Sequence, residues 1–215
     1  SAGYQGTVEV GETALLETQG WALTVSVGQW LDTDLFGSNS AGGVYIADQL
    51  STLSVVAMKD ASGIGSLGYL TESGEQGVWL QPSIEGVSLE SPIIWEQDNV
   101  WHLTYASINE ANQSTIVSQT STDEGRTWSE PTTLIEPHDD WASLRVEPND
   151  WVLINDIPTL IYAGTDDKTW ELGLSQWNGE LWSTSPEPWF ELGRPGNWDD
   201  SSVRDAKLQP EGDGY

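Results

Sequence analysis

The sequence contains no cysteine, and only seven lysine and arginine residues stand against 34 aspartate and glutamate residues. Without cysteine the chain can form neither a disulfide bond nor a thiolate metal site. Methionine occurs once, and the absence of any run of 18 apolar residues predicts that no segment inserts into a membrane. The first residues show no signal-peptide pattern, so we expect a soluble, mature chain.

The excess of acids gives a formal net charge of −27. Such a surface repels nucleic acid and anionic lipid, so we exclude both as partners. The acids are scattered along the chain, which argues against a disordered acidic tail. They can keep a secreted protein soluble, suit a high-salt environment that screens self-repulsion, or recruit Ca²⁺. We therefore expect an extracellular or cell-surface protein, and a high-salt habitat stays open.

Helix signals are almost absent, whereas short runs rich in β-branched and aromatic residues recur. No 12-residue stretch free of glycine and proline has apolar residues at helical spacing. Turn residues such as "QDN", "NDIP", "DDK" and "NGE" separate the runs. The pattern predicts an all-β chain with strands in "WALTVSV", "GVYIA", "LSVVAM", "VWHLTYA", "STIVSQT", "WVLIN" and "TLIYAG".

The strands recur as a larger unit. Residues 91–107 match residues 147–164, since each segment holds a proline, a polar turn and then a strand with Tyr-Ala. A turn that ends on tryptophan follows each unit, at Trp128 and Trp182, and an earlier, weaker copy of the unit ends at Trp79. The three tryptophans stand 49 and 54 residues apart. A period of roughly 50 residues with about four strands is typical of a β-propeller blade. A β-sandwich is the alternative, but a sandwich does not require this repeat.

The repeat divides the chain into three parts. Residues 41–200 are predicted to form roughly three blades of a five- or six-bladed type, and residues 201–215 open a further blade. Residues 1–40 are irregular and can belong to the first blade or close the last one. Either the strands around "GTVEV" and "ALLET" complete the last blade, or the chain is part of a longer propeller. The hairpin-like "GDGY" at the end favours the second alternative.

The stretch "STDEGRTW" carries Ser121, Asp123, Gly125 and Trp128 in the pattern Ser-x-Asp-x-Gly-x-Thr-Trp. It resembles the Asp-box (BNR repeat) of sialidases and related propellers. The resemblance implies a structural turn at the rim, in which the hydroxyl and carboxylate cap backbone N–H groups. The second copy, "SQWNGELW", has Trp177 where Asp123 stands, so this turn tolerates loss of the acid.

The wider pattern is similar to five-bladed glycosidases that act on arabinose, xylose or fructose polymers. Their blades open with Asp-Pro-like pairs, and "NWDDSSVRDAKLQPEGDGY" resembles such a blade start. This resemblance implies two aspartates and one glutamate at the starts of blades as catalytic residues.

The repeat register places Ser91, Glu147 and Asp205 at equivalent blade starts, facing a shared central cavity. Glycoside hydrolysis uses two carboxyl groups, one as general acid and one as base or nucleophile. Glu147 and Asp205 are therefore the predicted catalytic pair, with Asp34, in "WLDTDLFG", as a third candidate. The alternative is that these acids only cap strand ends.

Arg145 and Arg204 precede the two blade starts and can bind substrate or pair with the acids. Trp141 and Trp198 are candidates for stacking on sugar rings. His138, beside Asp139 and Asp140, is a weak metal candidate, so we predict no metal site and no required cofactor, with Ca²⁺ as an open option. The "Arg-Ile-Pro" motif of sialidases is absent, which argues against sialidase chemistry.

The sequence thus predicts a carbohydrate-active propeller that binds a glycan or polysaccharide, in the manner of a glycoside hydrolase. Two alternatives stay open. One is a non-catalytic extracellular propeller that binds carbohydrate or protein, and the other is a structural surface or assembly module. The remainder of a longer propeller chain is a further expected partner.

Overall fold

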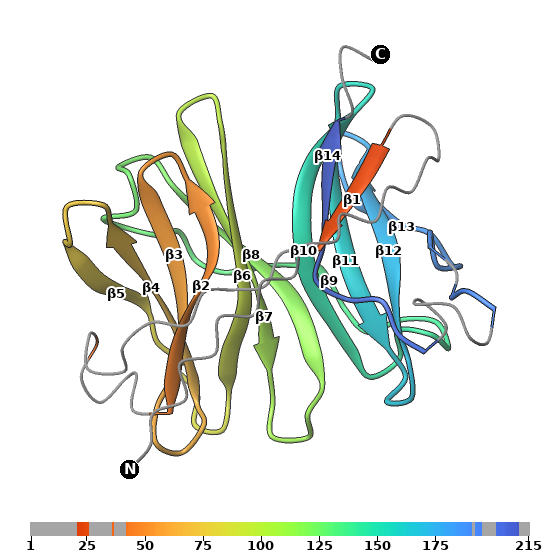
Figure 1. The fold of residues 1–215 in the computed structure, drawn as a ribbon, viewed down its shortest axis with the longest axis horizontal. Helices are drawn as coiled ribbons and strands as arrows, with labels where there is room; N and C mark the ends of the chain where they lie inside the picture. Colours follow the sequence, from red (N-terminus) through yellow and green to blue (C-terminus); the bar gives the residue numbers. More distant parts are fainter. Residues whose placement is uncertain (1–20, 26–35, 37–41, 191, 195–200, 211–215) are drawn as a thin grey trace.

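The chain folds into antiparallel sheets arranged as propeller blades, which confirms the predicted fold class. The computed structural model describes residues 21–25, 36, 42–190, 192–194 and 201–210. Within these residues the strands form three four-stranded sheets and one two-stranded sheet (Figure 1). The same residues include no helix long and apolar enough to cross a membrane.

Each four-stranded sheet is a meander in which strands pair in chain order. The first blade consists of β2 (Gly43–Leu50), β3 (Leu53–Lys59), β4 (Gly65–Thr71) and β5 (Gln76–Leu80). The second consists of β6 (Ser88–Gln97), β7 (Val100–Ile108), β8 (Ser114–Ser121) and β9 (Thr132–Ile135). The third consists of β10 (Arg145–Ile154), β11 (Ile157–Thr165), β12 (Trp170–Trp177) and β13 (Trp182–Thr184).

Two-residue turns join the first pair of strands in the second and third blades. Asp98 and Asn99 join β6 to β7, and Asn155 and Asp156 join β10 to β11. All four residues have positive φ, between 53° and 63°. Such turns match the right-handed twist of the flanking strands, and Asn and Asp tolerate this conformation well.

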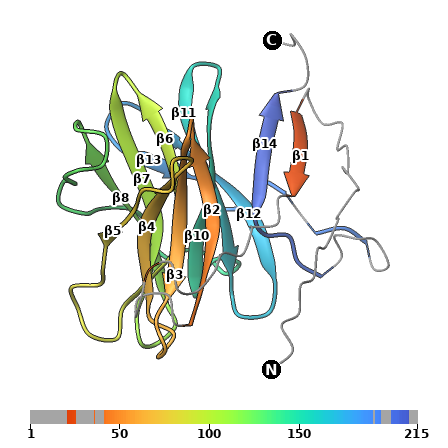
Figure 2. The same ribbon diagram turned by 60° about the vertical axis from the view of Figure 1, so that its left-hand side comes forward.

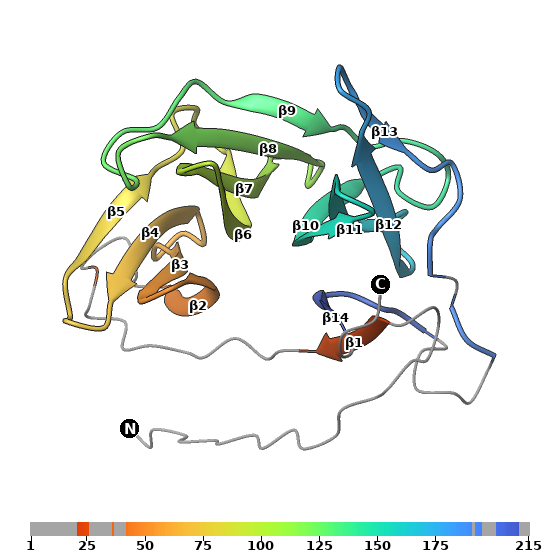
Figure 3. The same ribbon diagram turned by 90° about the horizontal axis from the view of Figure 1, so that it is seen from above.

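The blades are arranged radially, with their first strands innermost (Figure 3). β14 (Ala206–Pro210) continues the inner series after β2, β6 and β10, and it pairs with β1 (Trp21–Val25), beside which it runs in Figure 2. An ion pair of 2.6 Å between Lys207 Nζ and Asp48 joins β14 to β2. The inner strands therefore surround one centre.

Carboxylates at the bulges of two inner strands tie each of these blades to the next. Asp48 follows the bulge in β2 and accepts a hydrogen bond of 2.8 Å from the Ile94 N–H of the second blade. Asp150 follows the bulge in β10 and accepts one of 2.9 Å from the Leu208 N–H of β14. β6 and β14 lie at the edges of their own sheets among the described residues, so each acid satisfies an N–H on an edge strand.

Apolar side chains fill the spaces between adjacent sheets. One cluster, which includes Leu103 and Tyr105, joins the first and second blades, and Trp79 and Trp128 pack against it. A second cluster, with Trp182 packed against it, joins the second and third blades, and a third lies between the third blade and β14. The repeating tryptophans thus lie between blades, because a four-stranded sheet needs a neighbour to cover each face.

The described strands fall into three stretches of the chain. The strands of the three blades span residues 43–184, and β14 lies in the predicted opening strand at 201–215. β1, from the irregular first part, supplies the antiparallel partner of β14. The segments "GTVEV", "ALLET" and "GDGY" lie outside the described residues.

Candidate active site

The starts of the inner strands bring four side chains to equivalent positions. Counting back three residues from Asp48 and from Asp150 gives Tyr45 on β2 and Glu147 on β10. Ser91 and Asp205 hold the corresponding positions on β6 and before β14, and Ser91 Oγ donates a hydrogen bond of 2.9 Å to Glu147 Oε2. We call these four residues the inner quartet.

Glu147 is the buried centre of this site. Its side chain is only 1% exposed, and Arg145 on the same strand forms an ion pair with Oε1. Arg204, from the segment before β14, binds Oε2 at 2.5 Å, where Ser91 also donates. Both carboxylate oxygens are therefore bound, as a buried charge requires. Both arginines form ion pairs with Glu147, and their contact with substrate stays a prediction.

Asp205 is the exposed acid of the inner quartet. Its side chain is 65% exposed, and Arg204 Nε lies 3.7 Å from its carboxylate. Desolvation by the surrounding protein raises the pKa of Asp205, the charge of Glu147 raises it further, and Arg204 opposes both effects. Asp205 and Ser91 both have positive φ, at 59° and 51°. Backbone strain of this kind is common where a side chain must be aimed at a ligand.

Trp170, at the start of β12, holds Arg204 in place. The Arg204 guanidinium lies over the Trp170 ring at 4.4 Å from its centroid. The Trp170 N–H donates to Ser202 Oγ at 2.8 Å, and the Val203 N–H donates to the Trp170 carbonyl at 2.9 Å. One residue thus fixes both the backbone before Arg204 and the guanidinium itself. No local motif in the sequence marks Trp170 as a site residue.

Tyr45 was also missed, although the spacing to Asp48 identifies it once the bulges are known. Burial raises the pKa of Tyr45 to about 12, and the charges of Glu90, Glu147 and Asp205 add to this effect. The same charges show that Tyr45 lies close to the predicted acids. Tyr45 therefore adds a neutral hydroxyl to the site at neutral pH.

The other predicted site residues lie elsewhere or outside the described part. Asp34 and Trp198 fall among the residues that the structure does not describe. Trp141 packs against the third blade, with its ring stacked on Tyr162 at 5.7 Å and its Nε1 donating to the Pro186 carbonyl at 3.0 Å. Its proposed role in sugar stacking stays a prediction.

The metal candidate around His138 has protein partners instead. Its Nδ1 contacts Asp139 at 2.8 Å, and its Nε2 contacts the Tyr162 hydroxyl at 2.9 Å. Across the described ranges, no group of three or more histidine, aspartate or glutamate side chains is placed to hold a metal ion.

The stretch "STDEGRTW" forms a capped turn between β8 and β9. Ser121 Oγ accepts from the Gly125 N–H at 2.9 Å, and Asp123 accepts from both the N–H and the hydroxyl of Thr127, at 2.8 and 2.7 Å. Gly125 has a φ of +79°, and Trp128 packs edge-on against Trp79 at 5.2 Å. The turn is thus held together by hydrogen bonds among its own residues.

Removal of the Asp123 carboxylate should lower stability in a pH-dependent way. Hydrogen bonds from Thr127, and then from Ser121, lower the pKa of Asp123 to about 2, against 3.8 for the free side chain. The ionised form therefore stabilises the fold fully above pH 4, and this contribution disappears as the pH falls through about 2. In urea unfolding, Asp123→Ala should be less stable than wild type at pH 7, with the difference shrinking towards pH 2. Thr122→Ala, an exposed neighbour, serves as the control, and a difference independent of pH would contradict this role.

Comparisons with known proteins agree with the fold. No protein-family model matches the sequence, and no curated protein matches it either. Among solved structures, a thermostable family-43 glycoside hydrolase aligns with a TM-score of 0.55 and 12% identity over 79% of this chain and 56% of that one. A glycosyl hydrolase from Bacteroides ovatus aligns with a TM-score of 0.53 and 14% identity over 80% of this chain and 61% of that one.

A third similar structure comes from the GH130 family of mannoside phosphorylases, which contains glycoside hydrolases that target β-1,2-mannosidic linkages in Candida mannan. It aligns with a TM-score of 0.53 and 14% identity over 81% of this chain and 61% of that one. The chain thus spans between 56% and 61% of the length of these three proteins. At such identity the likeness shows the fold alone, an all-β propeller.

Proposed function

We propose that this chain is part of a secreted glycoside hydrolase with the inner quartet as the centre of its active site. The observation that carries the proposal is the shared contact of Arg204 with Glu147 and Asp205, two acids from the starts of adjacent inner strands. The fold likeness to glycoside hydrolases supports a glycan as the substrate.

The two acids have different environments, which suggests different roles. Asp205 is exposed and its pKa is raised, as suits a group that donates a proton to a glycosidic oxygen. Glu147 is buried and both of its oxygens are bound, so we assign it the positioning of Arg204 and Arg145. A second acid that touches substrate is then required, and Asp34 remains the candidate for it.

The substrate is proposed to be an uncharged sugar polymer. A sialidase needs arginines that clamp the carboxylate of its substrate. Arg145 and Arg204, the two arginines beside the inner quartet, are both engaged by Glu147. The exposed acid of the inner quartet, Asp205, would repel an anionic sugar.

A propeller that binds glycan without cleaving it is the second candidate. The burial of Glu147, which leaves a single exposed acid among the described members of the inner quartet, favours this alternative. The interaction of Arg204 with the Trp170 face would then serve only to shape a binding surface.

A panel of neutral polysaccharides separates the two candidates. The panel consists of arabinan, xylan, levan and mannan, with polygalacturonate as the anionic control. The hydrolase proposal expects release of reducing sugar from at least one neutral polymer, together with binding measured by calorimetry. Binding without any release would reject the hydrolase and support the second candidate, and release from polygalacturonate alone would reject an uncharged substrate.

A further inference from the structure

Exposed apolar side chains gather at the end of the third blade that lies away from the inner quartet. Seven large hydrophobic residues are exposed in the described part of the chain, and four of them belong to this end: Leu153, Ile157, Trp177 and Leu181. They flank the β10–β11 and β12–β13 turns, whereas the inner quartet lies at the opposite end of β10. Clustered exposure of this kind marks an interaction site more often than scattered exposure does.

The centre of this surface is one cross-strand row. Leu153 pairs with Pro158, and Trp177 pairs with Trp182. Thr159 pairs with Gln176, so the next position in the same register sets Pro158 beside Trp177. Residues directly opposite one another project from the same face of a sheet. One apolar row thus crosses all four strands, with one residue from each strand: Leu153, Pro158, Trp177 and Trp182. The row is about 14 Å wide at normal strand spacing. Its most exposed members are Leu153, at 53%, and Trp177, at 36%.

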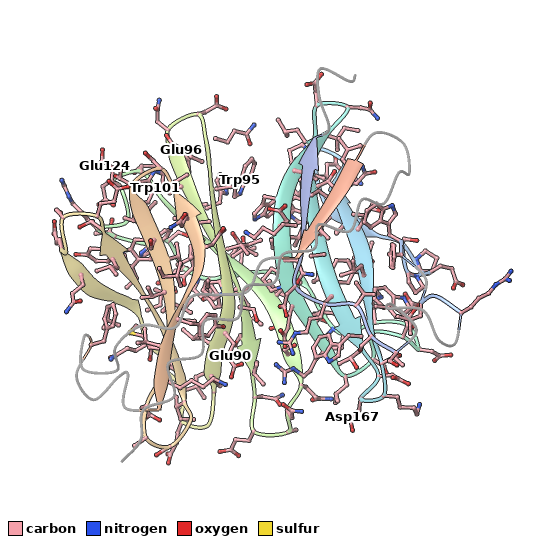
Figure 4. The ribbon with its side chains drawn as sticks, in the orientation of Figure 1. Glu90, Trp95, Glu96, Trp101, Glu124 and Asp167 are labelled. Atoms are coloured by element: carbon pink, nitrogen blue, oxygen red, sulfur yellow. The ribbon has the colours of Figure 1, made fainter. Side chains whose placement is uncertain are left out.

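Stacked rings on the same face extend from the row towards the second blade. Trp182 packs edge-on against Trp151 at 4.9 Å, and Trp151 stacks on Trp95 of the second blade at 4.9 Å. Trp95 in turn packs on His102 at 4.8 Å, and Trp151 Nε1 donates to Thr104 Oγ1. In Figure 4, Trp95 lies between the second and third blades, at the end opposite Glu90. The rings are held before any ligand arrives, which lowers the entropy lost on binding.

The two turns that flank the row carry charge of one sign. The β10–β11 turn contains Asp156 and the β12–β13 turn contains Glu180, and neither turn contains lysine or arginine. The surface therefore repels nucleic acid, anionic lipid and acidic sugars. Carboxylates at its edge can accept hydrogen bonds from hydroxyl groups, while the apolar row can cover a flat apolar face.

We propose that the row Leu153–Pro158–Trp177–Trp182 is a second carbohydrate-binding site that takes an uncharged polysaccharide. A sugar chain has the chemistry this surface recognises, since each ring combines an apolar C–H face with a rim of hydroxyl donors. The site would hold a polymer at the opposite end of the blade from the inner quartet, and it does not depend on hydrolysis there. Binding at this row anchors the protein to an insoluble or polymeric glycan.

Native gel electrophoresis in gels that contain each polysaccharide of the panel tests the proposal. Wild type should be retarded by a neutral polysaccharide, and Trp177→Ala should weaken this binding roughly tenfold. Trp189→Ala, which removes a tryptophan of similar exposure (39%) outside the row, should behave as wild type. In an Asp205→Asn background, Trp177→Ala should weaken binding by the same factor, which separates this site from the proposed active site.

Four outcomes would overturn the proposal. They are no retardation by any neutral polymer, retardation only by polygalacturonate, equal losses in Trp177→Ala and Trp189→Ala, and no loss when Trp177→Ala is added to Asp205→Asn. Size-exclusion chromatography with light scattering tests a fifth outcome that would overturn the proposal. If wild type is a dimer and Trp177→Ala is a monomer, the row is an interface between two copies of the chain. Circular dichroism of Trp177→Ala checks that the variant is folded, and Leu153→Ser is the second variant if it is not.

Discussion

Replacement of Asp205 by asparagine is expected to slow glycoside hydrolysis by about 10²–10⁴-fold without unfolding the chain. Asparagine matches the size of the side chain and tolerates the φ of 59° at this position, but its amide cannot act as a general acid. Because the Asp205 side chain is exposed, the loss of its weak contact with Arg204 should change stability little. The measurement is kcat/KM on the polysaccharide that wild type cleaves.

Glu124→Gln is the matched control for this substitution. Glu124 is also an exposed acid with positive φ, at 59°, but it lies in the turn between β8 and β9. We expect its activity to equal that of wild type. The pH profile adds a second readout: since the pKa of Asp205 is raised, the rate should fall with rising pH through a value above the ordinary 3.8. Undiminished turnover in Asp205→Asn would remove Asp205 from the mechanism.

Replacement of Glu147 by glutamine is expected to lower the free energy of unfolding by about 3 kcal/mol. The substitution keeps the shape of the side chain but leaves two guanidinium groups without their common counter-charge. Arg145 is mostly buried, so it cannot recover full hydration, whereas Arg204 is 38% exposed and can recover part of it. This partial recovery places the effect at the lower end of the range for buried ion pairs.

Glu90→Gln provides the comparison for Glu147→Gln. Glu90 pairs with Lys59 at 3.0 Å, but both groups are more exposed, so the expected loss is below about 1 kcal/mol. Urea unfolding of both variants at pH 7 measures the difference. A loss below 1 kcal/mol for Glu147→Gln as well would mean that the arginines are not organised by this acid.

The repeat was the feature that the sequence revealed best. The aromatic strands and the tryptophan-ended turns recur at roughly 50 residues, because each blade must cover its neighbour with similar side chains. This periodicity predicted the all-β class, the propeller and the equivalence of Ser91, Glu147 and Asp205. The structure joins these three residues through Glu147 and Arg204.

Two members of the site, Tyr45 and Trp170, had no recognisable signal in the sequence. Tyr45 belongs to the first blade. The register of that blade against the third becomes clear only from the bulges, which show that Asp48 and Asp150 hold equivalent positions in the two blades. Trp170 reaches Arg204 from β12, 34 positions earlier in the chain, through a ring contact that no local pattern encodes. Contacts between strands of different sheets depend on how the blades stack.

The sequence by itself determined the class of the fold, the blade period and the capped turn at Ser121–Trp128, since these depend on local spacing and turn chemistry. Only the tertiary structure decided the burial of Glu147 and the exposure of Asp205, which hold equivalent positions in the repeat. Burial depends on what the neighbouring blade and the segment 202–205 place over each acid. Two carboxylates with the same place in the repeat thereby acquire different partners, different pKa behaviour and, as we propose, different roles.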